Sequence, residues 1–277
     1  MNYILLAAGR SGSTLLTNYL SSHPVVRCHH EPFNQTGWHN EIKHYDRALN
    51  ALNHLEKKGL TISNYKKLQS LGRSIVKRHN GSTHVDPFKK SKDIKCEGFK
   101  LTWAQGKPML EDLGLWLTQN AHIKCVFLYR FDFLARYVSY KLSRKNKVWH
   151  SNSKPRDATP FEVDPVEFKA FCHQQQTLEQ DFLTMLTNTK TNTFITSYED
   201  LCKAPLSRVN EVFSFLRCPS INALKEVTTK LVVQDLESLV LNYKSLNSAA
   251  VNIEADEKRK RAAQLLLPHA IWQATKG

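Results

Sequence analysis

A glycine- and hydroxyl-rich segment, GRSGSTLL at residues 9–16, has the composition of an anion-binding turn. It follows an apolar run at residues 3–8 and opens a helical pattern at residues 13–20. Glycine allows a tight turn close to a ligand, and a helix N-terminus presents free N–H groups and the positive end of its dipole. An ordinary turn with a serine cap is the alternative. The predicted anion-binding residues are Arg10, Ser11, Gly12, Ser13, Thr14 and Leu15.

Two common nucleotide-binding loops are excluded by the spacing of this segment. A Walker A loop needs GxxxxGK[ST], but here there is no lysine and the glycines are closer together. A dinucleotide-binding GxGxxG is also absent, and no later apolar strand ends in an aspartate clearly placed for magnesium. We therefore expect a phosphate-like ligand, bound without the motifs that hold a nucleoside triphosphate.

A second group of polar residues follows the apolar run at residues 123–129. Arg130 ends that run, where ligands of α/β proteins bind, and its planar fork suits phosphate oxygens. Asp132 is placed to cap the next helix, and Ser139 lies about two turns into it. Arg136, one turn before Ser139, is an alternative or additional phosphate ligand.

Together these segments resemble the sulfotransferases that use 3′-phosphoadenosine 5′-phosphosulfate (PAPS). RSGSTLL is similar to that family's 5′-phosphosulfate loop, and YRFD followed by ARYVS is similar to its 3′-phosphate element. YEDL at residues 198–201 is similar to the turn after a later strand. GFKLTW at residues 98–103 is similar to the middle strand of the bacterial carbohydrate branch, which includes trehalose and Nod-factor chitooligosaccharide sulfotransferases. The resemblance runs from residue 4 to about residue 201.

The chain departs from the family pattern in two places. The commonest family spacing places the serine eight residues after the arginine, whereas Ser139 follows Arg130 by nine. The RKGxxG element near the C-terminus of the cytosolic steroid and phenol enzymes is missing, which fits the carbohydrate branch and leaves the adenine contacts unassigned.

The resemblance also implies roles for individual residues. Glu31, before Pro32, matches the proposed base of the carbohydrate-type enzymes, which would take the proton of the acceptor hydroxyl. His29 and His30 are alternative bases because histidine titrates near neutral pH. Arg10 and the loop N–H groups would stabilise charge in an in-line displacement, and no metal is required. Arg130 and Ser139 would hold the 3′-phosphate.

Alternating strand and helix patterns predict the fold class. Such alternation favours an α/β fold with three layers around a mostly parallel sheet. The resemblance implies that this fold has a P-loop-like sulfotransferase core. Residues from about 38 to 93 contain two helical patterns and predict a helical cap inserted into one domain spanning residues 1–277. The predicted strands are residues 3–8, 25–28, 96–104, 123–129 and 193–197. The predicted helices are residues 13–20, 108–117 and 205–216, one helix that contains residues 134–142, and one helix that begins at residues 164–165.

Charge and apolar content narrow the class of protein. The 39 basic and 25 acidic residues give a net charge of +14, which attracts anions without choosing among them. No stretch approaches 18 apolar residues, and the N-terminal apolar run has no basic residue before it, so we expect a cytoplasmic protein. The six cysteines lack CxxC spacing and are expected to be mostly buried free thiols.

The leading hypothesis is transfer of the sulfuryl group from PAPS to a hydroxyl of a carbohydrate or glycoconjugate. The alternatives are a kinase with a degenerate phosphate loop, which predicts binding of ATP and magnesium, and a basic protein that binds nucleic acid, which predicts steep salt dependence. A relative that binds PAPS without catalysis is a third possibility. The sequence does not predict which carbohydrate is the acceptor, which of its hydroxyls is sulfated, or the oligomeric state.

Overall fold

Five parallel strands form one sheet, in the order β2-β3-β1-β4-β5, in the computed structural model. The structure describes residues 2–29, 94–103, 108–146, 159–225, 235–247, 250 and 253. The predicted helical cap at residues 38–93 and the predicted base Glu31 therefore lie outside the described residues. The strands are β1 (Asn2–Ala8), β2 (Val26–His29), β3 (Cys96–Trp103), β4 (Lys124–Tyr129) and β5 (Thr193–Ser197).

The central strand, β1, pairs with β3 on one side and β4 on the other. When helices cover both faces of a parallel sheet, every residue of a central strand is buried. Its sequence is therefore a continuous apolar run and not an alternation of apolar and polar residues. Residues 3–8 of β1 are all buried, as are all six residues of β4. This is why these two strands could be predicted within one or two residues of their observed ends.

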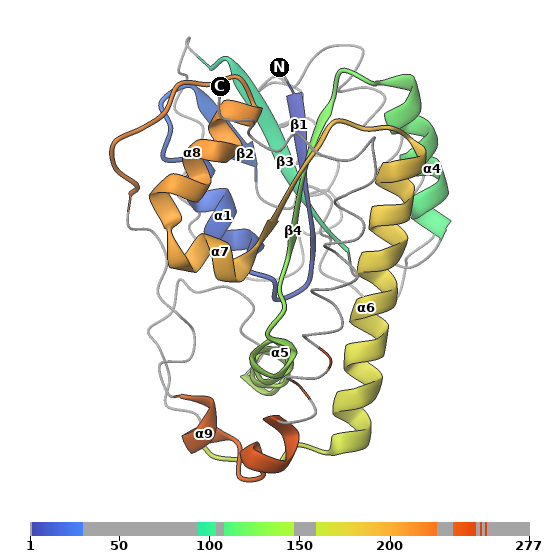
Figure 1. Ribbon diagram of the computed structural model, residues 1–277, viewed down its shortest axis with the longest axis vertical. Coiled ribbons are helices and arrows are strands. Elements are labelled where there is room, and N and C mark those ends of the chain that lie inside the picture. Colours follow the sequence, from blue (N-terminus) through green and yellow to red (C-terminus); the bar gives the residue numbers. More distant parts are fainter. Residues whose placement is uncertain are drawn as a thin grey trace, which may run out of the picture.

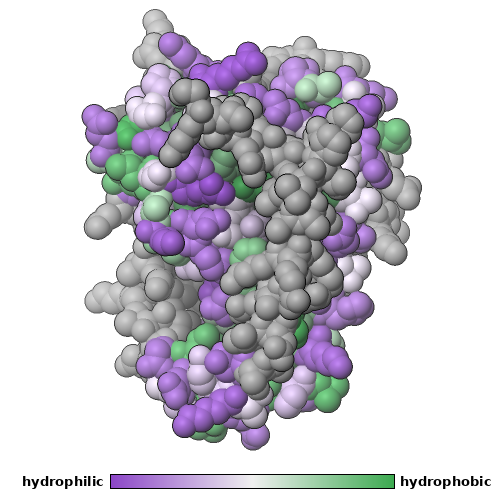
Figure 2. Space-filling view, viewed as in Figure 1, coloured by the Kyte–Doolittle hydropathy of each residue, from purple (hydrophilic) through white to green (hydrophobic). Residues whose placement is uncertain are grey.

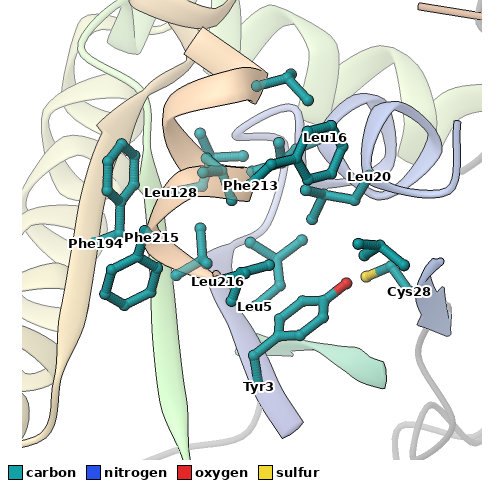
Figure 3. Packing of buried hydrophobic residues seen from close by; sticks show 14 of the residues in the cluster. Tyr3, Leu5, Leu16, Leu20, Cys28, Leu128, Phe194, Phe213, Phe215 and Leu216 are labelled. Carbon is teal, nitrogen blue, oxygen red and sulfur yellow. The ribbon is translucent and has the colours of Figure 1, made fainter. Parts of the chain in front are cut away.

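One face of the sheet is covered by three helices, α1 (Ser13–Leu20), α7 (Tyr198–Lys203) and α8 (Pro205–Phe215). Figure 1 shows them together on one side of the strands. Their apolar side chains meet alternate residues of β1 and β4 in a cluster seen in Figure 3. That cluster includes Tyr3, Leu5, Leu16, Leu20, Leu128, Phe194, Phe213, Phe215 and Leu216.

The opposite face is covered by α4 (Pro108–Gln119) and the long helix α6 (Pro165–Asn188). Apolar residues of these helices pack against the other set of alternate strand residues, among them Ile4, Leu6 and Phe127. Asp164 caps α6 as predicted, because its Oδ1 accepts a hydrogen bond from the backbone N–H of Val166 at 2.8 Å. Helices on both faces of a parallel sheet confirm the predicted three-layer α/β class.

Helix α5 (Phe133–Asn146) lies beyond the carboxyl ends of the strands rather than on a face of the sheet (Figure 1). It packs on the first half of α6 and on the segment around α9 (Leu236–Leu239) in a third apolar cluster. Asp132 Oδ1 accepts from the backbone N–H of Ala135 at 2.7 Å, so the predicted cap of this helix is present. The position of α5 brings its side chains to the carboxyl edge of the sheet.

One element differs from its predicted form. Residues 198–201 were predicted as a turn, but they open the short helix α7 directly after β5. Ser197 Oγ accepts from the backbone N–H of Asp200 at 3.0 Å and starts this helix. Leu201 is its one buried residue, so the segment has no apolar periodicity that a sequence could show.

All six cysteines are free thiols, as predicted, but they are not all buried. Cys202 is exposed and Cys218 is half-buried. Cys96 donates a hydrogen bond to Cys218, and this bond, with the nearby Lys124 ammonium, lowers the pKa of Cys218 to about 7. The buried cysteines are Cys28, Cys96, Cys125 and Cys172.

Cys218 is expected to alkylate faster than Cys202 at pH 7, although Cys202 is more exposed. The thiolate is the reacting species, and ordinary thiols ionise at a pKa of about 8.5. The rate of iodoacetamide labelling, followed at each site by peptide mass spectrometry between pH 5 and 9, should be half-maximal near pH 7 for Cys218. A midpoint near pH 9 at this site, or faster labelling of Cys202 at pH 7, would contradict the expectation.

No helix within the described ranges combines the length and apolar character of a membrane span. Figure 2 shows mainly hydrophilic residues on the described part of one face of the molecule, with small separate apolar areas. The apolar side chains described above lie instead in the three buried clusters.

Candidate anion-binding site

The strand order places a change of direction in the connections between β1 and β4. The connection from β1 leads to β2 at one edge of the sheet, and the connection from β4 leads to β5 at the other. Neighbouring parallel strands whose connections leave in opposite directions form a topological switch point, where α/β proteins bind ligands at the carboxyl ends. Arg10 follows β1 and Arg130 follows β4, so both predicted arginines stand at this point.

The loop after β1 adopts an unusual backbone conformation. Arg10 has a φ of 61° and Gly12 has a φ of 85°, both in the left-handed region. Gly12 is the N-cap of α1, and having no side chain it cannot cap the helix itself. Ser11 Oγ donates to the carbonyl oxygen of Ala8 at 2.7 Å, so this predicted ligand uses its hydroxyl to close the turn. The N–H groups of the first turn of α1 thus face the carboxyl edge of the sheet.

Arg10 and Ser139 meet across this edge, although 129 residues separate them in the chain. Arg10 donates to Ser139 Oγ through Nε at 3.0 Å and through Nη2 at 2.8 Å. Burial lowers the pKa of Arg10, and the positive charge of Arg130 lowers it further. Two like charges are therefore held close together beside a helix N-terminus, an arrangement that an anion stabilises.

Arg130 lies over an aromatic ring. Its guanidinium carbon is 4.4 Å from the ring centroid of Tyr198, and Nη2 is 3.7 Å from Asp132 Oδ2. The buried Nε atom has no hydrogen-bond partner among the described residues. A buried donor without a partner is rare in folded proteins, and a bound anion at this place would satisfy it.

Tyr198 also contacts the loop. A Cβ atom built on Gly12 would overlap the Tyr198 ring and lie only 2.8 Å from its Cε2 atom. The same ring therefore touches the loop through Gly12 and the second cation through Arg130. Sequence reasoning grouped Tyr198 with a family segment but gave it no role, because no spacing rule links position 198 to position 12.

The backbone after Arg130 is held by a carboxylate. Glu199 Oε1 accepts from the N–H groups of Phe131 and Asp132, both at 3.1 Å. These bonds tie the turn between β4 and α5 to the start of α7. They fix the place where Arg130 leaves the sheet, which sequence reasoning did not foresee.

Lys100 is a further cation at the site that the sequence did not single out. It lies on β3, is 1% exposed, and its Nζ donates to Thr14 Oγ1 at 3.2 Å. Lysine is rarely buried to this extent, so its burial beside the predicted anion loop is informative. In the sequence it reads as a polar residue in a strand. The sequence feature that could have pointed to Lys100 is its position in GFKLTW, two residues after a glycine.

Arg136, the alternative ligand to Arg130, points elsewhere. Its guanidinium is fully buried and bonds to Glu179, Gln175 and the carbonyl oxygen of Gly9. Arg130, by contrast, keeps a buried N–H without a partner among the described residues. Of the two arginines, Arg130 is therefore the one with an N–H group that a bound anion could still satisfy.

The third group of predicted residues is only partly described. His29 ends β2 and pairs in register with Phe99, next to Lys100. His30 and Glu31 lie outside the described residues, so the proposed base remains a prediction. Because all strands are parallel, the segment that follows β2 leaves the sheet at the same edge as the loop after β1. In the described part of the chain, no group of three or more His, Cys, Asp or Glu residues could hold a metal ion.

When compared with known proteins, the chain is similar only to solved structures, and this similarity is distant. No family model and no curated protein matches the chain. The sulfotransferase domain from the curacin biosynthetic pathway is 14% identical over 88% of this chain and 86% of that one, with a TM-score of 0.45. A sulfotransferase from Alicyclobacillus acidocaldarius is 11% identical over 91% and 93%, with a TM-score of 0.44. Retinol dehydratase, solved with androsterone and the inactive cofactor PAP, is 12% identical over 100% and 83%, with a TM-score of 0.38. Likenesses at this level transfer neither activity nor ligand to this chain.

Proposed function

We propose that the protein is a sulfotransferase that moves the sulfuryl group of PAPS to a hydroxyl group. The observation that carries this proposal is the convergence of Arg10, Arg130 and Ser139 with the N-terminus of α1 at the switch point. These are the residues that the resemblance in sequence assigns to the two phosphate-bearing ends of PAPS. The loop lacks the lysine of a Walker A motif, which favours this ligand over a nucleoside triphosphate.

The residues present fit a ligand with two separate anionic groups. The helix N-terminus and Arg10 would hold the 5′-phosphosulfate, and Arg130 with Ser139 would hold the 3′-phosphate. PAPS when bound supplies an activated sulfuryl group and a stable leaving group. The donors of the chain would stabilise charge that grows on the transferring oxygens, which is the largest single contribution in many group transfers. Lys100, beside Thr14, adds a buried positive charge on the same side.

For the acceptor, we propose a carbohydrate or glycoconjugate, and for the site of action, the cytoplasm. The support for a sugar is the sequence likeness of residues 98–103 and of Glu31 to the bacterial carbohydrate branch. Glu31 would accept the proton of the acceptor hydroxyl at the edge where β2 ends. A sugar hydroxyl is a weak acid, so a base within hydrogen-bond reach is needed for attack at neutral pH.

The test of this function is binding of adenosine 3′,5′-bisphosphate, the product that PAPS leaves behind. At 100 times its Kd, a ligand that binds only the folded protein adds about 2.7 kcal/mol of stability, which a thermal unfolding curve resolves. Arg10→Ala should weaken binding roughly 10- to 150-fold, because hydrogen bonds to charged groups contribute about 1.5–3 kcal/mol. Ser139→Ala should weaken binding by about 2- to 10-fold. Arg144→Ala, an exposed arginine on the same helix, is the matched control and should change little.

The same titration separates the alternatives. Stabilisation by ATP with magnesium and not by the bisphosphate would favour a kinase and reject the proposal. No response to either nucleotide, together with polynucleotide binding that falls steeply with salt, would favour a basic nucleic-acid-binding protein. Bisphosphate binding that Arg10→Ala leaves unchanged would place the ligand somewhere other than this site.

A further inference from the structure

Arg136 is the bulkiest fully buried side chain in the described part of the chain, and its guanidinium joins three elements. Nη1 donates to Glu179 Oε1 at 2.7 Å, and Nη2 donates to Gln175 Oε1 at 2.7 Å. Nε donates to the carbonyl oxygen of Gly9 at 3.0 Å. Glu179 is 1% exposed, and it lies one turn after Gln175 on the same face of α6. Helices α5 and α6 are thus connected to the loop after β1 through one side chain.

The bond to Gly9 acts at the start of the anion-binding loop. The next residue, Arg10, has left-handed backbone torsions, which a residue other than glycine keeps only when its surroundings enforce them. One turn after Arg136 on α5, Ser139 accepts two hydrogen bonds from the Arg10 side chain. Successive turns of α5 therefore hold the backbone of Gly9 and the side chain of Arg10.

A buried ion pair is a poor way simply to join two helices. The loss of hydration offsets most of the attraction, and a well-packed apolar pair often stabilises a protein as well or better. An exposed pair, Lys141 with Glu167, already links the same two helices at 2.9 Å. What Arg136 adds is a planar group of donors that reaches two helix side chains and a loop carbonyl at once, which a lysine cannot do.

We propose that Arg136, held by Glu179 and Gln175, is a positioning residue that sets the backbone at Gly9 and Arg10 and thereby the affinity of the loop for a phosphate-bearing ligand. Arg136 would not touch that ligand, because its guanidinium is fully buried and its Nε, Nη1 and Nη2 atoms each donate to an oxygen of the protein. It acts through Gly9 and Arg10. The identity of the ligand in this inference rests on the proposed function. The effect of Arg136 on the backbone of the loop does not depend on that function.

The test compares the same substitution in two ion pairs that join the same helices. Glu179→Gln keeps the size of the side chain and removes the charge in the buried pair, whereas Glu167→Gln does so in the exposed pair. Near-ultraviolet circular dichroism first establishes conditions in which each variant is folded. Under these conditions we measure the Kd for adenosine 3′,5′-bisphosphate and the rate of amide hydrogen exchange of residues 9–13 relative to that of β4. We expect Glu179→Gln to raise the Kd by about tenfold or more and to speed exchange in the loop. Glu167→Gln should leave both within about twofold.

A milder variant keeps the test decisive if Glu179→Gln does not fold. Gln175→Leu removes one hydrogen bond and leaves the ion pair intact, and it should raise the Kd by about threefold with faster loop exchange. Folded variants that melt earlier but keep the wild-type Kd and the wild-type relative exchange would overturn the proposal and leave Arg136 a packing residue. If the wild-type protein binds no bisphosphate, the proposed function fails, and the exchange of residues 9–13 alone decides the positioning role.

Discussion

Gly12→Ala is expected to destabilise the folded protein by about 2–5 kcal/mol, whereas Gly9→Ala in the same loop should cost little. Gly12 has a φ of 85°, a conformation that costs an alanine about 1–2 kcal/mol. The added methyl group would also overlap the ring of Tyr198, and overpacking of this kind costs about 1–3 kcal/mol. A Cβ on Gly9 meets nothing within 4 Å. Urea unfolding of the two variants measures the difference.

The double variant Gly12→Ala/Tyr198→Ala separates the two causes. Removing the ring relieves the overlap but not the backbone strain, so the double variant should be more stable than the sum of the single changes predicts. Bisphosphate binding should also weaken in Gly12→Ala, because the loop and the contact of Tyr198 with Arg130 shift together. Equal free energies of unfolding for Gly9→Ala and Gly12→Ala would contradict the expected overlap between the Tyr198 ring and a Cβ atom at position 12.

Glu31→Gln is expected to lower sulfuryl transfer by about 10²- to 10⁴-fold while leaving bisphosphate binding nearly unchanged. The amide has the shape of the carboxylate but cannot accept a proton, and general-base catalysis contributes about this factor. The measurement is kcat for release of adenosine 3′,5′-bisphosphate from PAPS in the presence of a saccharide acceptor.

His29→Gln and His30→Gln are the controls for this assignment, since both neighbours are alternative bases. Each should keep most of the activity if Glu31 removes the proton. A large loss of kcat in His30→Gln with a small loss in Glu31→Gln would transfer the role to the histidine. A large rise in the Kd for the bisphosphate in Glu31→Gln would mean that the carboxylate organises the donor site and not the acceptor.

The sequence predicted strands best where both faces of the strand are buried. The runs that became β1 and β4 were predicted because a parallel strand between two helical layers is apolar throughout. Helix α7 was missed because it buries only Leu201 and starts through a hydrogen bond of Ser197, which is a local polar event. Amphipathic periodicity cannot reveal such a helix.

At the site, the loop, Arg130 and Ser139 could be proposed from local spacing, but the contacts that these residues make could not. The contact between Arg10 and Ser139 spans 129 positions. The choice between Arg130 and Arg136 depends on Glu179, which lies 43 positions after Arg136. Lys100 was overlooked because a lysine within a strand suggests an exposed face, whereas here it is buried beside Thr14. Each of these depends on the tertiary fold.

The order of strands in the sheet has a consequence for biosynthesis. The central strand β1 is made before both of its partners, since β3 and β4 end at Trp103 and Tyr129. Ribosomes extend a chain by about 5–20 residues per second, so about 5–19 seconds pass between completion of β1 and completion of β3, the first of its two neighbours to be made. During that time β1, which is apolar from residue 3 to residue 8, has neither neighbour. Parallel pairing across long separations is also slow to form. The nascent chain therefore exposes its future centre to chaperones and to other unfolded chains before it can bury it.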